Sequence, residues 1–159
     1  MKTEFIVFIF CLLFIPTVAF PFDFDKSRDL ILDRAAPWTE KVKLIDEIAP
    51  LGSEKVLEVL VTVYEDSFLH FGCPSILYHT VNGLRYFRGN KRAIRIVRDG
   101  INYREPEVRM ISLEVLGVIG SEEDLEVLKP FLTNKNSFES HFAQSAIENI
   151  KMRVQRSAL

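Results

Sequence analysis

The feature that most constrains the fold of this chain is a pattern that the sequence repeats three times. Each copy opens with a proline, continues with apolar residues at helical spacing as far as a glycine, and starts a second apolar run behind a Ser or Asn. The opening prolines, 37 and 32 residues apart, are Pro37, Pro74 and Pro106. The closing glycines, 37 and 31 residues apart, are Gly52, Gly89 and Gly120. A period in this range, with two one-sided helices per unit, is typical of a stacked α-solenoid.

The residues at the ends of the predicted helices agree with this interpretation. Proline suits the first position of a helix, where its missing N–H removes no hydrogen bond. Ser53, Asn90 and Ser121 follow the glycines and are residue types that cap helix N-termini. Pro130 falls inside the second helix of the third unit and predicts a kink or an early end there. We therefore predict an all-α fold, a short right-handed α-solenoid of stacked helical hairpins.

Segments on both sides of the repeats are predicted to cap the stack. A final helix is predicted from apolar residues that recur every four positions, namely Phe138, Phe142, Ala146 and Ile150. Its cations are expected to face water near the C-terminal end, and they are Lys151, Arg153 and Arg156. Residues 20–36 are predicted to start disordered and to end in a short helix around Leu30–Arg34 that covers the first hairpin. The repeat domain is then residues 37–159, about three hairpins and the C-terminal capping helix.

The third unit carries a family resemblance. It contains "EVR" at residues 107–109, "LEVLGVIGSEED" at 113–124 and "LEVLKPFL" at 125–132, and it resembles a HEAT repeat of the bilin-lyase-like (PBS lyase) subclass. The first two units match less closely, since Lys41 or Leu77 stands where the third unit has Arg109. The resemblance implies a HEAT-like or armadillo-type superhelix that binds proteins through its concave face. It does not carry bilin-lyase activity over, because repeats form a scaffold and function depends on sites added to it.

The first 19 residues have the pattern of an export signal. Lys2 precedes an uninterrupted apolar run over residues 5–15, too short to span a bilayer, and Thr17-Val18-Ala19 fits a signal-peptidase site. We predict that residues 1–19 are a signal peptide cleaved after Ala19, which places the mature protein in the periplasm or outside the cell. An uncleaved membrane anchor is the alternative, because Glu4 offsets the charge of Lys2.

Cysteine usage follows from this prediction. Cleavage would remove Cys11 and leave Cys73 as the only thiol, which excludes an intramolecular disulfide in the mature chain. We expect Cys73 to be buried as a small hydrophobic residue. An intermolecular disulfide through Cys73 is the alternative.

Charge alternates in sign from unit to unit. The net charge is −5 over residues 20–66, +6 over 67–104 and −3 over 105–159. If the closing glycines are equivalent, two sets of residues align on neighbouring second helices: Glu54, Lys91 and Glu122, and Glu58, Arg95 and Glu126. A basic helix between two acidic ones would form ion pairs across repeats, each contributing about 0–1 kcal/mol. This interpretation needs no partner.

The functional alternative makes the basic helix a docking strip. The candidate partner-binding residues are Lys91, Arg92, Arg95 and Arg98, hereafter the basic strip. Arginine offers paired hydrogen bonds to carboxylates, so the expected partner is an acidic protein. Nucleic acid is not expected, because the flanking units carry no excess of positive charge. Contact with a membrane is expected only if the N-terminal segment stays uncleaved.

Other chemistry has little support in the sequence. His70, Cys73 and His79 do not have the usual spacing of zinc ligands, so we predict no metal site and no cofactor. No motif for a catalytic nucleophile, a zinc protease or a phosphate loop occurs, and we predict no catalytic residue. Tyr86 and Tyr103 are candidates to flank a partner groove.

The function predicted from the sequence is an exported, non-catalytic HEAT-like protein-binding or assembly scaffold. One alternative is an enzyme or enzyme subunit related to bilin-lyase-type HEAT proteins. Another is a membrane-tethered scaffold that keeps its N-terminal anchor.

The export signal generates the first testable prediction. The full-length chain is expressed in a host that secretes proteins, and the intact mass of the purified protein is measured. The mass should correspond to a chain that begins at Phe20, because signal peptidase cleaves after small residues. Mass spectrometry checks this directly. A mature protein that still contains Met1 would contradict it and favour the anchored form.

Overall fold

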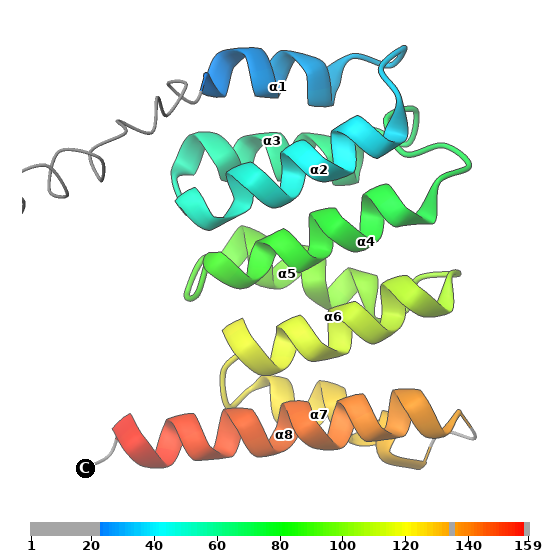
Figure 1. Cartoon of the computed structure of the whole chain (residues 1–159). Helices are drawn as coiled ribbons and strands as arrows, with labels where there is room; N and C mark the ends of the chain where they lie inside the picture. The colour runs from blue at the N-terminus through cyan, green and yellow to red at the C-terminus, as the bar shows by residue number, and fades with distance from the viewer. Residues whose placement is uncertain (1–22, 134–135, 158–159) are drawn as a thin grey trace, which may run out of the picture.

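A computed structural model describes residues 23–133 and 136–157, and within them the chain forms eight α-helices (Figure 1). They are α1 (Phe24–Leu32), α2 (Trp38–Ile48), α3 (Glu54–Glu65), α4 (Pro74–Gly83), α5 (Lys91–Gly100), α6 (Pro106–Ile119), α7 (Asp124–Leu128) and α8 (Ser137–Ser157). Short 3-10 turns follow three of them, at Ala49–Leu51, Leu84–Tyr86 and Lys129–Thr133. The predicted signal peptide, residues 1–19, lies outside the described residues. None of the described helices is long and apolar enough to cross a bilayer.

The helices are arranged as a stack of hairpins. Figure 1 shows α2, α4, α6 and α8 one above the other in a first row, with α3, α5 and α7 behind them in a second row. The α1 helix packs on both helices of the first hairpin. Loops that join one hairpin to the next lie along one edge of the stack, on the right in Figure 1, and the turns within hairpins lie along the opposite edge. The prediction of an all-α stack of helical hairpins is confirmed.

The predicted start and stop residues act as expected in the first two hairpins except for Pro37, which is the N-cap residue before α2 and not its first residue. Pro74 is the first residue of α4, and Ser53 caps α3 by accepting a hydrogen bond from the N–H of Val56. Gly52 and Gly89 have positive φ values of 57° and 77°. Residues with a Cβ atom rarely adopt this left-handed conformation, so glycine is favoured at both positions. These local signals set the length of each helix before any packing is considered.

One contiguous core runs through the stack between the two rows. Its fully buried members come from every hairpin and include Ile45, Leu57, Leu84, Ile96 and Leu116. Burying a side chain of this size contributes about 1.5–3 kcal/mol. Stability therefore depends on contacts between neighbouring hairpins and cannot be assigned to any single unit.

The third hairpin differs from the other two. Its second helix, α7, has only five residues and ends at Leu128, two residues before Pro130, so the predicted early end is confirmed. Ser121 does not cap the helix with its own oxygen. Its backbone N–H donates instead to Asp124 Oδ2 at 2.7 Å. Leu132 lies after the end of α7 and is 40% exposed.

The N-terminal helix is longer and begins earlier than predicted. The sequence predicted a helix around Leu30–Arg34, whereas α1 begins at Phe24. The reason is a cap, since the Asp23 carboxylate accepts a hydrogen bond from the N–H of Lys26. Ile31 anchors this helix in the core, fully buried.

Two predictions for the C-terminal helix are wrong in detail. Phe138 was predicted on the buried face and is 68% exposed, in the first turn of α8. Arg153 was predicted to face water and is half-buried, donating to the carbonyl oxygens of Gly117 and Gly120 at 2.8 and 2.5 Å. These carbonyls lie at the C-terminal end of α6 and lack partners within that helix, so the guanidinium satisfies them.

Close packing of α6 against α8 generates the second prediction. A Cβ added at Gly117 would lie 2.6 Å from Ala146 Cα, too close without movement of one helix. Gly117→Ala should therefore lower the free energy of unfolding by about 1–3 kcal/mol. In an exposed helix the same change would raise the free energy of unfolding by about 1 kcal/mol. The sign of the change, measured by urea denaturation, therefore distinguishes a close helix contact from an exposed position.

The double variant Gly117→Ala with Ala146→Gly is the matched control. It removes the 2.9 Å contact with Ala146 Cβ but leaves the 2.6 Å approach to Ala146 Cα, so the double variant should remain less stable than the parent. A Gly117→Ala protein more stable than the parent would contradict the close approach of the two helices.

Candidate functional site

The basic strip lies on α5, between α3 and α7, and two of its arginines pair with α3. Arg92 Nη1 lies 2.5 Å from Glu58 Oε1, and Arg95 Nη2 lies 3.4 Å from Glu65 Oε1. The sequence alignment had placed Arg95 beside Glu58. The expected pair of Arg95 with Glu58 is therefore wrong: Arg92, one turn earlier, meets Glu58, and Arg95 reaches Glu65 near the end of α3. Glu126, the other expected partner, pairs instead with Lys129 of its own unit.

Arg98 forms the most buried of these pairs. Its Nε lies 2.5 Å from Oδ1 of Asp124, whose side chain is fully buried, and this hydrogen bond raises the pKa of Arg98. The other oxygen, Asp124 Oδ2, accepts from the N–H and hydroxyl of Ser121. Three of the four residues of the basic strip are thus paired within the chain. Lys91 is exposed and forms no ion pair with the described residues.

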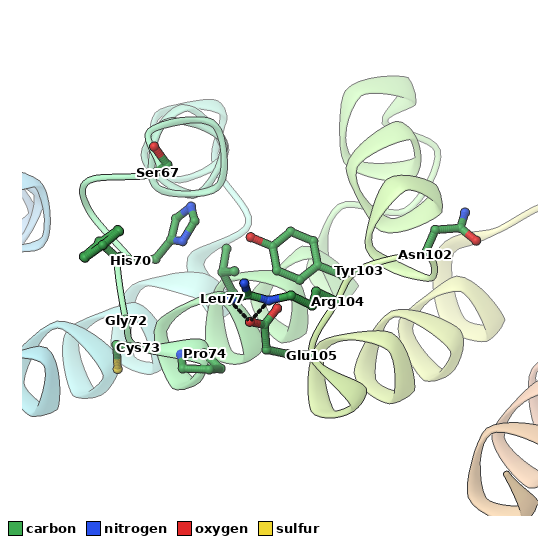
Figure 2. Close-up of a pocket in the computed structure, with 11 residues that line it drawn as sticks. Ser67, His70, Gly72, Cys73, Pro74, Leu77, Asn102, Tyr103, Arg104 and Glu105 are labelled. Atoms are coloured by element: carbon green, nitrogen blue, oxygen red, sulfur yellow. Dashed lines mark hydrogen bonds and ion pairs between the residues drawn. The ribbon is translucent and has the colours of Figure 1, made fainter.

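A second site, which the sequence analysis missed, lies between two loops that join hairpins. A pocket of about 660 Å³ is lined by the loop from α3 to α4 and the loop from α5 to α6 (Figure 2). His70 projects from the first loop and Tyr103 from the second, on opposite sides of the space between them. Leu77 of α4 forms part of the wall. We call this space the loop pocket.

The loop pocket contains a carboxylate with an unused oxygen. Glu105 Oε1 accepts from Nε and Nη2 of Arg104 at 2.8 and 2.6 Å, drawn as dashed lines in Figure 2. Glu105 Oε2 is buried and has no hydrogen-bond partner, alone in this among the side-chain atoms of the part of the chain that the structure describes. A buried polar atom without a partner costs about 1–3 kcal/mol.

Arg109 holds the second loop in place. Its Nη1 donates to the carbonyl oxygens of Tyr103 and Arg104 at 3.0 and 2.8 Å. Its Nε and Nη2 donate to Glu139 Oε1 of α8 at 2.9 and 2.6 Å. The wall of the loop pocket that carries Tyr103 and Glu105 is therefore fixed to two helices before anything binds.

Exposed aromatic side chains lie along the same edge of the stack. Phe71 lines the loop pocket and is 85% exposed, and Phe68 is 68% exposed with the Arg34 guanidinium 4.7 Å above its ring. Trp38 begins α2 and Phe138 lies in the first turn of α8, both at this edge and both more than half exposed. We call these four residues, Trp38, Phe68, Phe71 and Phe138, the aromatic edge.

Burial favours the uncharged forms of the imidazole and phenol groups at the loop pocket. It lowers the pKa of His70, which favours the neutral imidazole. It also raises the pKa of Tyr103, and it raises that of Tyr64, whose ring centroid lies 6.4 Å from that of Tyr103, to about 12. The pocket thus presents aromatic faces and neutral donors beside the ion pair of Arg104 and Glu105.

The structure separates residues that the sequence analysis had considered together. His70 and Cys73 line the loop pocket, but His79 pairs with Asp46 of α2 at 2.8 Å. Within the described residues, no three His, Cys, Asp or Glu side chains are grouped so that they could hold a metal ion. Cys73, expected to be buried, is half-buried because it lies in the loop directly before α4. Tyr86 lies at the opposite edge from Tyr103, so they do not flank one groove.

The stacked hairpins and the pocket between their loops define a small α-solenoid of the HEAT-repeat kind. No family model matches the chain, and no curated protein sequence matches it. Among solved structures, it is similar to human deoxyhypusine hydroxylase in complex with glycerol, with a TM-score of 0.68 and 20% sequence identity. The similarity covers 84% of this chain and 45% of the other, so the chain spans less than half the length of that protein. At this identity the likeness shows the fold alone.

The Arg98 pair generates the third prediction. Arg98→Ala would leave the buried Asp124 carboxylate without its cation and should lower the free energy of unfolding by about 2 kcal/mol or more. Arg95→Ala is the matched control, because its pair is exposed on both sides and should contribute less than about 1 kcal/mol. Chemical denaturation of the two variants measures the difference. Equal, small effects would contradict a structural role for Arg98.

Proposed function

We propose that this protein is an exported, non-catalytic scaffold of the HEAT-like kind that binds another protein through the aromatic edge and the loop pocket. The observation that carries the proposal is the exposed Phe71 side chain beside a preformed pocket that contains an unpaired carboxylate oxygen. Export rests on the signal pattern of residues 1–19.

The aromatic edge has the composition of a binding surface. Single exposed apolar residues are ordinary, but four large aromatic side chains along one edge are typical of interaction sites. Aromatic residues contribute most of the binding energy at many interfaces, especially next to a pocket. All four lie in loops or first helical turns, so they can contact a partner without disturbing the stack.

The basic strip is a second candidate surface, for an acidic partner. Two of its residues favour it, since Lys91 has no ion pair with the described residues and Arg95 has only a long, exposed one. Arg92 and Arg98 are less available to a partner, because they already form ion pairs with Glu58 and Asp124. A charge-reversal test therefore belongs at Lys91 and Arg95, where it leaves the buried Asp124 pair intact.

Membership of the PBS lyase subclass stays a prediction, based on the sequence of the third unit. From this resemblance we infer only a scaffold role and no lyase activity. A membrane-tethered form stays the alternative if residues 1–19 are retained. A bound chromophore would favour the enzyme alternative, and it would colour the purified protein.

The fourth prediction tests the aromatic edge. Phe71→Ser should weaken binding of the partner by about tenfold or more, because it removes an aromatic contact beside the pocket. Tyr86→Ser is the matched control, since Tyr86 is a half-exposed aromatic residue on the opposite edge. The partner is first identified by affinity capture and mass spectrometry, and the dissociation constants are then measured with purified proteins.

The outcomes separate the two candidate surfaces. Loss of binding in Phe71→Ser with normal binding in Lys91→Glu/Arg95→Glu supports the aromatic edge. The reverse pattern would assign binding to the basic strip and overturn the proposal.

A further inference from the structure

A second pocket, of about 510 Å³, lies at the edge opposite the loop pocket. It is formed by the turn between α4 and α5, the C-terminal end of α6 and the C-terminal half of α8. Three arginines line it, Arg88, Arg153 and Arg156, and among the described residues no carboxylate side chain does. We call it the arginine pocket. Its cations come from segments more than 60 residues apart, so only the fold brings them together.

One of the three cations is fixed in position. Arg153 donates to the carbonyl oxygens of Gly117 and Gly120, which holds its guanidinium at the end of α6. Burial lowers the pKa of Arg153, and the positive charge of Arg88 lowers it further. Two guanidinium groups therefore repel each other across this pocket.

Among the residues that the structure describes, no carboxylate side chain in the pocket lining balances this charge. Arg88 and Arg156 are exposed and form no ion pair with the described residues. Asp124 acts on Arg153 through its charge, but its two oxygens are already bonded to Arg98 and Ser121. The arginine pocket thus keeps excess positive charge that a bound anion would neutralise.

We propose that the arginine pocket binds the phosphate group of a phosphate monoester. Guanidinium groups donate paired hydrogen bonds to phosphate oxygens, and a tetrahedral oxyanion can accept from three arginines at once where a planar carboxylate offers fewer oxygens. The pocket is larger than a phosphate group, and Val118 and Met152 add apolar surface to its lining. A phosphate carried on an apolar group fits both features. This site is independent of the aromatic edge.

The fifth prediction uses phenyl phosphate as the probe and benzoate as its carboxylate counterpart. Isothermal titration at physiological ionic strength should show binding of phenyl phosphate to the purified protein and at least about tenfold weaker binding of benzoate. Arg88→Ala and Arg156→Ala should each weaken phenyl phosphate binding by about tenfold. Neither side chain is buried, so thermal unfolding should stay close to that of the parent. Arg153 is left unchanged, because it also caps α6.

Arg95→Ala is the matched control, since it removes an exposed arginine outside the pocket. It should leave phenyl phosphate binding unchanged. Absence of binding, equal binding of benzoate, or equal weakening by Arg95→Ala would each overturn the proposal. Vesicles with and without phosphatidic acid then distinguish the source of the phosphate: sedimentation that depends on Arg88 assigns it to a lipid, and its absence to a soluble monoester.

Discussion

The candidate site depends on the hydrogen bonds and the ion pair that the Arg109 guanidinium forms. This guanidinium bonds to the nearly fully buried Glu139 on α8 and to two backbone carbonyls of the loop before α6, so one side chain joins the last helix, the third hairpin and the wall of the loop pocket. Breaking a buried pair of this kind by removing one partner costs about 3–5 kcal/mol, because the other charge stays buried. A binding pocket built from loops needs such a fixed wall, since loops are otherwise the most mobile part of a repeat protein.

The arginines of this stack fall into two groups: those paired with a buried carboxylate and those exposed without an ion pair among the described residues. Arg98 and Asp124 form a pair in which the carboxylate is fully buried and also bonded to Ser121, so this pair fixes how α5 sits against the start of α7. Arg88 and Arg156 lie in solvent with no such partner among the described residues. Surface pairs contribute little to stability. The unpaired cations are therefore the ones available to a ligand.

The sequence predicted the helices well because their signals are local. Pro74, Ser53 and Gly52 act through contacts within four residues, and the apolar spacing identifies the buried face without knowledge of its neighbour. Ion-pair partners were predicted less well, since Arg92 and not Arg95 meets Glu58. Such partners depend on the axial shift between helices, which no local pattern encodes. The loop pocket was missed for the same reason, although two phenylalanines in a loop, Phe68 and Phe71, were a usable signal.

The stack itself explains why both candidate pockets lie at its edges. A helix within either row is covered by its neighbours in that row and by the other row, so most of its surface is committed to packing. Loops and turns at the two edges are free of that requirement, and here they differ in chemistry. One edge carries exposed aromatic rings and a carboxylate, and the other carries arginines. Because the two edges lie on opposite sides of the same core, ligands at the two proposed sites would not compete for the same surface.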